Sequence, residues 1–163
     1  MKLLSICLAF GSLILLTSCA DKKKSDHQPI RMSEEKQETT TQAQKTSSVP
    51  IMLDNKGIGP VKSVTFSDEI DQELAKRGAE LFKLKCTACH NATQRTIGPP
   101  MAGIYKKRSP EWVMNIILNP EEMLKKDPVA MALLKEYNNT VMLDQNIPED
   151  EARAMAEWFR TLK

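Results

Sequence analysis

The sequence predicts a small all-α domain of three to five helices, preceded by a disordered tether. Apolar residues recur at steps of three and four in residues 67–82 and 148–163, which is the spacing of amphipathic helices. A third helix is indicated at Ser109-Pro110, because serine is a good N-cap and proline suits the first helical position. Between residues 20 and 49 apolar side chains are almost absent, so that segment cannot form a core. The folded part therefore lies in the C-terminal part of the chain.

The N-terminus predicts an export signal. Lys2 supplies a positive charge, and residues 3–16 form an apolar run that is too short to span a membrane but fits a signal-peptide core. The run ends in Leu16-Thr-Ser-Cys19, which resembles the lipobox of bacterial lipoproteins and implies cleavage before Cys19 and lipid on that cysteine. The alternative is ordinary cleavage near Ala20, which leaves Cys19 as a free thiol. We expect residues 1–18 to be a lipoprotein signal peptide and Cys19 to be the membrane anchor.

A linker connects the anchor to the folded domain. Lys, Ser, Thr, Gln and Glu dominate residues 20–49, and a flexible coil of about 30 residues spans about 30 Å. Residues 50–66 are more apolar and are punctuated by Gly57 and Gly59-Pro60, which predicts an extended lead-in that lies against the domain. We therefore divide the chain into the signal peptide, the linker with lead-in at 19–66, and a folded domain at 67–163. The net charge of +2 does not favour nucleic-acid binding.

The first helix is expected to begin with Ser67 as its N-cap. Its apolar stripe consists of Ile70, Leu74, Gly78, Leu81 and Phe82. Glycine in a helix costs about 1 kcal/mol relative to alanine, so Gly78 predicts the close approach of another helix. The C-terminal helix is the expected partner, with Pro148 at its first position. Its inner face is Ala152, Met155, Ala156 and Phe159, with Trp158 and Leu162 at the border.

The segment Cys86-Thr-Ala-Cys-His90 carries the chemistry. Two thiols three positions apart, followed directly by histidine, are the attachment signature of a c-type haem. Thiols one helical turn apart can add to the two vinyl groups on one porphyrin edge, and His90 then faces the iron. A structural zinc site needs four ligands, and the other Cys and His residues lie near the N-terminus. A redox dithiol would follow a strand, whereas the residues before Cys86 predict a helix.

Between this motif and the C-terminal helix, the sequence predicts one rigid turn and three further helices. The turn is Ile97-Gly-Pro-Pro100. A helix starts at Ser109 and ends at Asn119-Pro120, with Trp112, Val113, Ile116 and Ile117 on its inner side. Two short helices follow at 121–126 and 128–137. Four cations form either a basic patch near the haem propionates or a solvated loop: Arg95, Lys106, Lys107 and Arg108.

These spaced features together resemble the class I c-type cytochromes over residues 67–163. In that family an N-terminal helix with glycine, and an aromatic residue four positions on, crosses a C-terminal helix that carries an aromatic residue. Gly78, Phe82 and Trp158 occupy these places. The resemblance implies a monohaem cytochrome c fold around one covalently bound haem c. Cys86 and Cys89 would attach that haem, and His90 would be one iron ligand.

The resemblance also implies the surroundings of the iron. The Pro99 carbonyl would accept a hydrogen bond from His90 Nδ1, which fixes the ring of the ligand. The second iron ligand would be a methionine in the loop before the C-terminal helix, where Met142 lies. The family often has proline after this methionine, whereas Leu143 follows here. Met131 is the main rival, and a Lys or Asn ligand or an open position would also be compatible with the sequence.

A haem iron held by His90 and Met142 has no vacant position for a substrate, so we expect an electron carrier and not an enzyme. Its partners would be a donor and an acceptor redox protein of a respiratory chain in the bacterial envelope, with no small-molecule substrate. Residues 57–62, 108–112 and 117–120 look similar to small cytochromes that accompany nitrous-oxide respiration, and a terminal oxidase is an equal candidate for the acceptor. The protein would face the periplasm, anchored by lipid at the inner or outer membrane. The alternative is a haem enzyme or a gas or redox sensor with an open distal site.

Overall fold

The computed structural model describes residues 49–163. The expected signal peptide, Cys19 and nearly all of the expected tether lie outside the described residues. The described part contains helices and no strand, which confirms the all-α prediction. In chain order the elements are α1 (Gln72–Lys85), the 3-10 helix η1 (Ile104–Lys106), α2 (Pro110–Leu118), α3 (Pro120–Lys126), α4 (Pro128–Glu136) and α5 (Glu149–Phe159).

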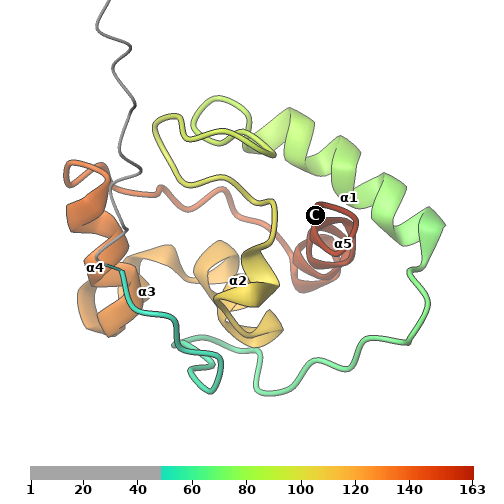
Figure 1. Ribbon diagram of the computed structural model, residues 1–163, viewed down its shortest axis with the longest axis horizontal. Coiled ribbons are helices and arrows are strands. Elements are labelled where there is room, and N and C mark those ends of the chain that lie inside the picture. Colours follow the sequence, from blue (N-terminus) through green and yellow to red (C-terminus); the bar gives the residue numbers. More distant parts are fainter. Residues whose placement is uncertain (1–48) are drawn as a thin grey trace, which may run out of the picture. The chain divides into compact units, whose positions relative to one another are not determined.

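Helices α1 and α5 cross at a point of very close contact. In Figure 1, α5 is seen nearly end-on while α1 lies across the view. The crossing lies at Gly78, where a Cβ atom would stand 2.9 Å from the Met155 Cα and closer still to the Ala154 carbonyl. The rings of Phe82 and Trp158 pack beside the crossing with their centroids 4.8 Å apart. The predicted helix contact at Gly78 is therefore confirmed.

Two helix starts differ from the prediction. Asp71, and not Ser67, is the N-cap of α1, because its carboxylate accepts a hydrogen bond from the Leu74 N–H at 2.9 Å. The Ser67 carbonyl instead accepts a hydrogen bond from the Arg160 guanidinium at 2.7 Å, which holds this stretch outside the helix. At α5, Pro148 is the N-cap, and the first helical residue is Glu149. The error at Ser67 arises because a favourable capping residue in the sequence does not show which contacts compete for its backbone. The shift at α5 is a single residue.

The middle helices form as the capping residues predict. Ser109 accepts a hydrogen bond from the Trp112 N–H at 3.1 Å and starts α2, and α3 and α4 begin within one residue of the expected positions. The turn between α3 and α4 is tied to α2, because the buried Asp127 carboxylate accepts a hydrogen bond from Trp112 Nε1 at 3.0 Å. The same carboxylate caps α4 through the N–H groups of Val129 and Ala130. The short helix η1 was not predicted.

Residues 49–66, which we name the strap, lie in an extended path across α2 and α3. The fully buried side chain of Asn115 accepts a hydrogen bond from the Val61 N–H at 3.0 Å and donates to the carbonyls of Lys56 and Val61, both at 2.9 Å. The Ile58 N–H donates to Met123 Sδ at 2.9 Å. The expected lead-in therefore lies against the domain, and its contacts with α2 and α3 are specific. Within residues 49–163 no helix is long and apolar enough to cross a membrane.

Candidate haem-binding site

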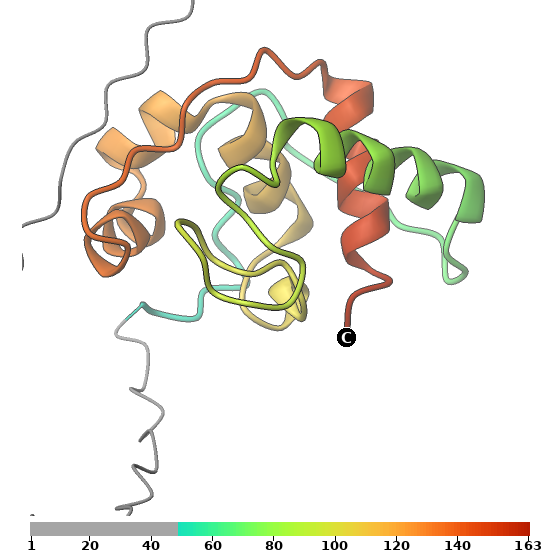
Figure 2. The ribbon, with the colours of Figure 1, turned by 90° about the horizontal axis from the view of Figure 1, so that it is seen from above.

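The attachment motif continues the last turn of α1. The Cys86 N–H donates to the Phe82 carbonyl at 2.9 Å, and the N–H groups of Cys89 and His90 both donate to the Cys86 carbonyl, at 3.1 and 2.9 Å. This turn follows directly on the C-terminal end of α1, so Cys86, Cys89 and His90 lie within five consecutive residues there. Figure 2 shows the loop that leads on from α1. The thiols are not joined by a disulfide. The arrangement has the donor set that covalent haem attachment requires.

The two thiols lie in different environments. Cys86 is half-buried with its Sγ 4.0 Å from Met155 Sδ, whereas Cys89 is exposed. Burial raises the pKa of the Cys86 thiol to about 11, and the nearby Lys85 cation offsets only part of this effect. A neutral thioether has no proton to lose, so the apolar surroundings of Cys86 suit the sulfur of a covalent attachment better than they suit a thiolate.

The His90 ring is fixed from two sides. Its Nδ1 lies 3.0 Å from the Pro99 carbonyl oxygen, which is the contact expected from the family resemblance. Gly98 packs directly on the ring, because a Cβ at this position would lie 2.6 Å from Nδ1. Gly98 is itself held by the hydrogen bond that its N–H donates to the Cys89 carbonyl at 2.7 Å. With Nδ1 engaged, Nε2 is the nitrogen that remains for a metal, and it has no hydrogen bond within residues 49–163.

A hollow of about 320 Å³ borders this histidine. Its lining comes from α1, the attachment motif, the loop that follows it, and Trp158 of α5; the residues are Ala79, Phe82, Lys83, Thr87, His90, Asn91, Ala92, Thr96 and Trp158. Ala79, Phe82, Ala92 and Trp158 give it apolar walls, and the other residues beside His90 are polar. Neither cysteine lines it, so the fit to haem depends on the donor set of Cys86, Cys89 and His90 and on the engaged Nδ1 of the histidine ring. The residues present therefore fit a covalently bound haem.

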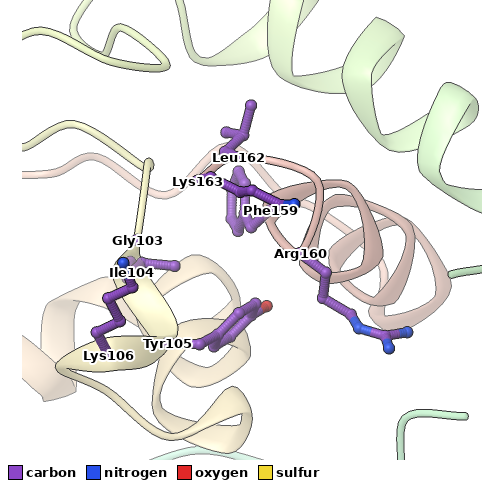
Figure 3. A pocket seen from close by; sticks show the side chains of 8 residues that line it. All are labelled: Gly103, Ile104, Tyr105, Lys106, Phe159, Arg160, Leu162 and Lys163. Carbon is purple, nitrogen blue, oxygen red and sulfur yellow. The ribbon is translucent and has the colours of Figure 1, made fainter. Parts of the chain in front are cut away.

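A second hollow of about 440 Å³ lies between η1 and the end of α5 (Figure 3). It contains none of Cys86, Cys89 and His90. The Tyr105 hydroxyl at this place donates to the Ala156 carbonyl at 2.7 Å, and burial raises the pKa of Tyr105 well above its usual range. Arg160, also in the lining, donates to the Glu157 carboxylate. These groups join elements of the fold, and the hollow is separate from the haem site.

Seven methionines lie within residues 49–163; four are buried, and Met52, Met131 and Met142 are half-buried or exposed. Met101, Met114, Met123 and Met155 are buried, in agreement with packing roles. Met142 is half-buried on the segment between α4 and α5 and packs against the core, and Met131 on α4 has 38% of its surface exposed. No hydrogen bond in the described part of the chain joins either of the last two to the attachment motif, and the choice of Met142 as iron ligand stays a prediction.

The four cations suggested as a basic patch do not act together. Arg108 is buried, donates to the Pro50 carbonyl at 2.8 Å, and stacks over Trp112 with 5.4 Å from Cζ to the ring centroid. Arg95 is paired with Glu136 at 2.9 Å. Arg95 is exposed but engaged in this pair, so only Lys106 and Lys107 of this set are exposed cations without an ion pair within residues 49–163. Two of the four residues thus have structural partners, which the sequence pattern did not indicate.

Other features of the site were missed as well. The packing of Gly98 on the His90 ring has no sequence signal beyond its position beside Pro99. The fully buried Glu157 on α5 pairs with Arg153 at 2.7 Å and accepts a hydrogen bond from the Asp71 N–H at 3.1 Å. Across residues 49–163 no three Cys, His, Asp or Glu side chains gather in a group that could hold a metal ion.

Comparisons with known proteins agree with this geometry. The sequence model described as cytochrome c matches residues 75–163. Cytochrome c from Rhodothermus marinus is similar in structure, with a TM-score of 0.61 and 43% identity over 63% of this chain and 88% of that one. An engineered cytochrome c from the same organism matches with a TM-score of 0.61 and 42% identity, over 63% of this chain and 89% of that one. The engineered protein bound to a carbene intermediate matches with a TM-score of 0.58 and 41% identity, over 63% of this chain and 88% of that one.

No curated protein sequence matches this chain significantly. The family match nevertheless spans the attachment motif, most of α1, all of α5 and the segment that carries Met142. Together with the donor set at Cys86, Cys89 and His90, this match accounts for one covalently bound haem c. The chain therefore belongs to the cytochrome c family.

Proposed function

We propose that this protein is a membrane-tethered electron carrier of the bacterial envelope, with His90 and Met142 as iron ligands. The observation that carries the proposal is the state of the His90 ring, whose Nδ1 contacts the Pro99 carbonyl at 3.0 Å while Nε2 is left for the iron. Haem c supplies one-electron exchange between ferric and ferrous iron when it is bound. Cys86 and Cys89 would hold the group covalently, and His90 and Met142 would bind its iron.

Exposed apolar side chains support an exchange of electrons with other proteins. Ile97 lies next to the turn that orients His90, and Val141 and Leu143 flank Met142; their exposed fractions are 52%, 55% and 69%. Both segments assigned to the iron ligands thus present apolar surface to solvent. Brief encounters between redox proteins use small interfaces of this kind. The donor and acceptor would be redox proteins of the envelope, with nitrous-oxide reductase or a terminal oxidase as candidate acceptors.

The membrane tether is proposed from the sequence of the N-terminal residues. Lipid at Cys19 would anchor the protein, and the polar residues that follow would let the domain reach its partners. A flexible connection to the membrane raises the effective concentration of the carrier near membrane-bound partners. The domain would face the periplasm from the inner or the outer membrane.

The absorption spectrum of the ferric holoprotein tests the ligand assignment. We expect the wild type and the control Met131→Ala to show the weak far-red charge-transfer band of sulfur on iron, and Met142→Ala to lose it. Retention of the band in Met142→Ala would show that another methionine binds. High-spin iron without the band in the wild type would instead indicate the open distal site of an enzyme or sensor, and the ferrous protein would then bind carbon monoxide rapidly.

A further inference from the structure

Arg95 joins the two segments that the proposed function assigns to the iron. Its Nη1 donates to Glu136 Oε1 at 2.9 Å, and its Nη2 donates to the Glu136 carbonyl at 2.6 Å. Its Cζ also lies 4.0 Å from the centroid of the Tyr137 ring. We name these contacts the Arg95 bridge. A guanidinium that makes two hydrogen bonds and one stacking contact at once is held in a single geometry, which an isolated surface ion pair is not.

On one side the bridge is fixed to the attachment motif. Thr96 Oγ1 donates to the Cys89 carbonyl at 2.7 Å, and the Thr96 N–H donates to the Gly98 carbonyl at 3.2 Å. The Asn91 side chain accepts hydrogen bonds from the N–H groups of Thr93 and Gln94 and closes the preceding turn. Residue 95 is therefore held in place relative to Cys89 and to the turn that orients His90.

On the other side the bridge reaches the start of the segment that carries Met142. Helix α4 ends at Glu136, and Asn138 and Asn139 follow with left-handed φ values of 58° and 57°. The segment then arches from α4 to α5 (Figure 2). Within residues 49–163, the hydrogen bonds of residues 141–147 stay inside that segment, such as the one that the Asn146 N–H donates to Asp144 Oδ1 at 2.7 Å.

Few contacts therefore hold this segment against the domain. Ile147 is buried at its far end and Met142 is half-buried in its middle. At its near end, the Arg95 bridge fixes the last turn of α4 from which the segment departs. A segment with this contact pattern opens at a lower free energy than the helices around it.

We propose that Arg95 is a positioning residue for Met142, because it ties the departure point of the methionine segment to the loop that follows Cys89 and His90. This inference rests on the proposed function, in which Met142 binds the iron. Loss of the bridge leaves the fold in place but lets the end of α4 and the methionine segment move away from the histidine side more often. Met142 then leaves the iron more often.

The test compares two ion pairs in the haem-loaded full chain. Arg95→Ala removes the bridge, and Arg77→Ala removes the exposed pair of Arg77 with Asp150 at 2.8 Å, which joins α1 to α5. The readout is the rate at which the ferrous protein binds carbon monoxide, because binding requires that Met142 first leaves the iron. We expect this rate to rise about five- to tenfold in Arg95→Ala and to change less than twofold in Arg77→Ala.

Two further measurements separate positioning from general destabilisation. Hydrogen exchange of the amides of residues 138–147 should speed up in Arg95→Ala while that of α1 and α5 stays unchanged. Arg95→Lys keeps a charge but loses the two-pronged contact and should give an intermediate rate. Equal carbon monoxide rates in wild type and Arg95→Ala, with the sulfur band present in both, would overturn the inference alone. Absence of the band in wild type would overturn the ligand assignment itself.

Discussion

At the scale of single residues, Gly78 decides how closely the two crossing helices approach. The backbone of α5 occupies the space that a side chain at this position would need, because a Cβ would stand 2.5 Å from the Ala154 carbonyl carbon. A main-chain group cannot rotate away as a side chain can. The position therefore excludes every residue except glycine unless the helices separate.

Gly78→Ala should destabilise the holoprotein by about 2–3 kcal/mol, although alanine is the better helix former. The overlap forces α1 away from α5 and loosens the aromatic packing of Phe82 on Trp158. Guanidinium-induced unfolding measures the change. The control Lys76→Ala alters an exposed position of the same helix and should stay within about 0.5 kcal/mol of wild type. A loss of unfolding free energy in Gly78→Ala as small as that in Lys76→Ala would contradict the close contact.

The sequence indicated the close helix contact at Gly78 but not the burial of Glu157. A glycine inside an apolar stripe is costly, so it predicts a neighbour, and the neighbour is present. A glutamate on a helix with many charges predicts solvent exposure, yet Glu157 is fully buried between Arg153 and Arg160. The Phe66 ring lies 4.7 Å from each guanidinium carbon. The two ion pairs are neighbours on one helix, at spacings of four and three residues. The cover over them comes from Phe66 and Asp71, far away in sequence, which spacing within α5 cannot indicate.

At the scale of elements, the strap shows how an irregular segment becomes part of a helical fold. Its backbone polar groups form hydrogen bonds with side chains of α2. Asn115 bonds to the backbone of Lys56 and Val61, and Glu111 Oε1 accepts a hydrogen bond from the Val64 N–H at 3.1 Å. The mixture of apolar residues and glycines predicted an extended lead-in. It did not predict the anchors, because Asn115 and Glu111 lie on a helix face where polar residues are ordinarily solvated.

The strap contact at Glu111 should respond to acid. Burial by itself would raise the pKa of Glu111, but hydrogen bonds from the backbone N–H groups of Glu111 and Val64 and the charge of Lys56 outweigh it, so the pKa is lowered. A lowered pKa in the folded state contributes stability above the unfolded pKa of about 4.3, and that contribution is lost as pH falls through the folded value.

The unfolding free energy of wild type should therefore fall more steeply below about pH 5 than that of Glu111→Gln, in which no charge titrates at this position. The measurement is urea unfolding of the two holoproteins at several pH values. At neutral pH the wild type should be the more stable of the two. Parallel curves over the acidic range would show that Glu111 does not contribute to the pH dependence.

At the scale of the whole molecule, the motif Cys86-Thr-Ala-Cys-His90 and the two helical stripes were enough to predict the fold class. The attachment geometry is local, since the thiols and the imidazole lie within one turn of each other, and local geometry follows from spacing. The position of Met142, in contrast, is not set by local spacing. Its place depends on a segment with few contacts, and the Arg95 bridge joins residues 41 positions apart. Spacing carries no information on such long-range pairs.

The assignment of a lipid anchor predicts a chemical difference at the N-terminus. When the protein is produced in bacteria with labelled fatty acid, wild type should incorporate label, and Cys19→Ser should incorporate at least about tenfold less because the acceptor sulfur is gone. Cys7→Ser is the matched control and should label as wild type does, because Cys7 leaves with the signal peptide. Equal labelling of wild type and Cys19→Ser would contradict anchoring at Cys19.

If the protein is anchored at Cys19 as proposed, the strap has a mechanical consequence. Any pulling force that enters the described domain along the chain reaches residues 49–66 before it reaches α1. The first bonds to carry load are those between the strap and the turn before α2, where Arg108 Nη1 donates to the Pro50 carbonyl at 2.8 Å and the Met52 N–H donates to the Lys107 carbonyl at 3.4 Å. The strap would peel from α2 while Cys86, Cys89 and His90 stay unloaded. In the anchored protein that we propose, these strap contacts would take up tension before the turn that holds Cys86, Cys89 and His90.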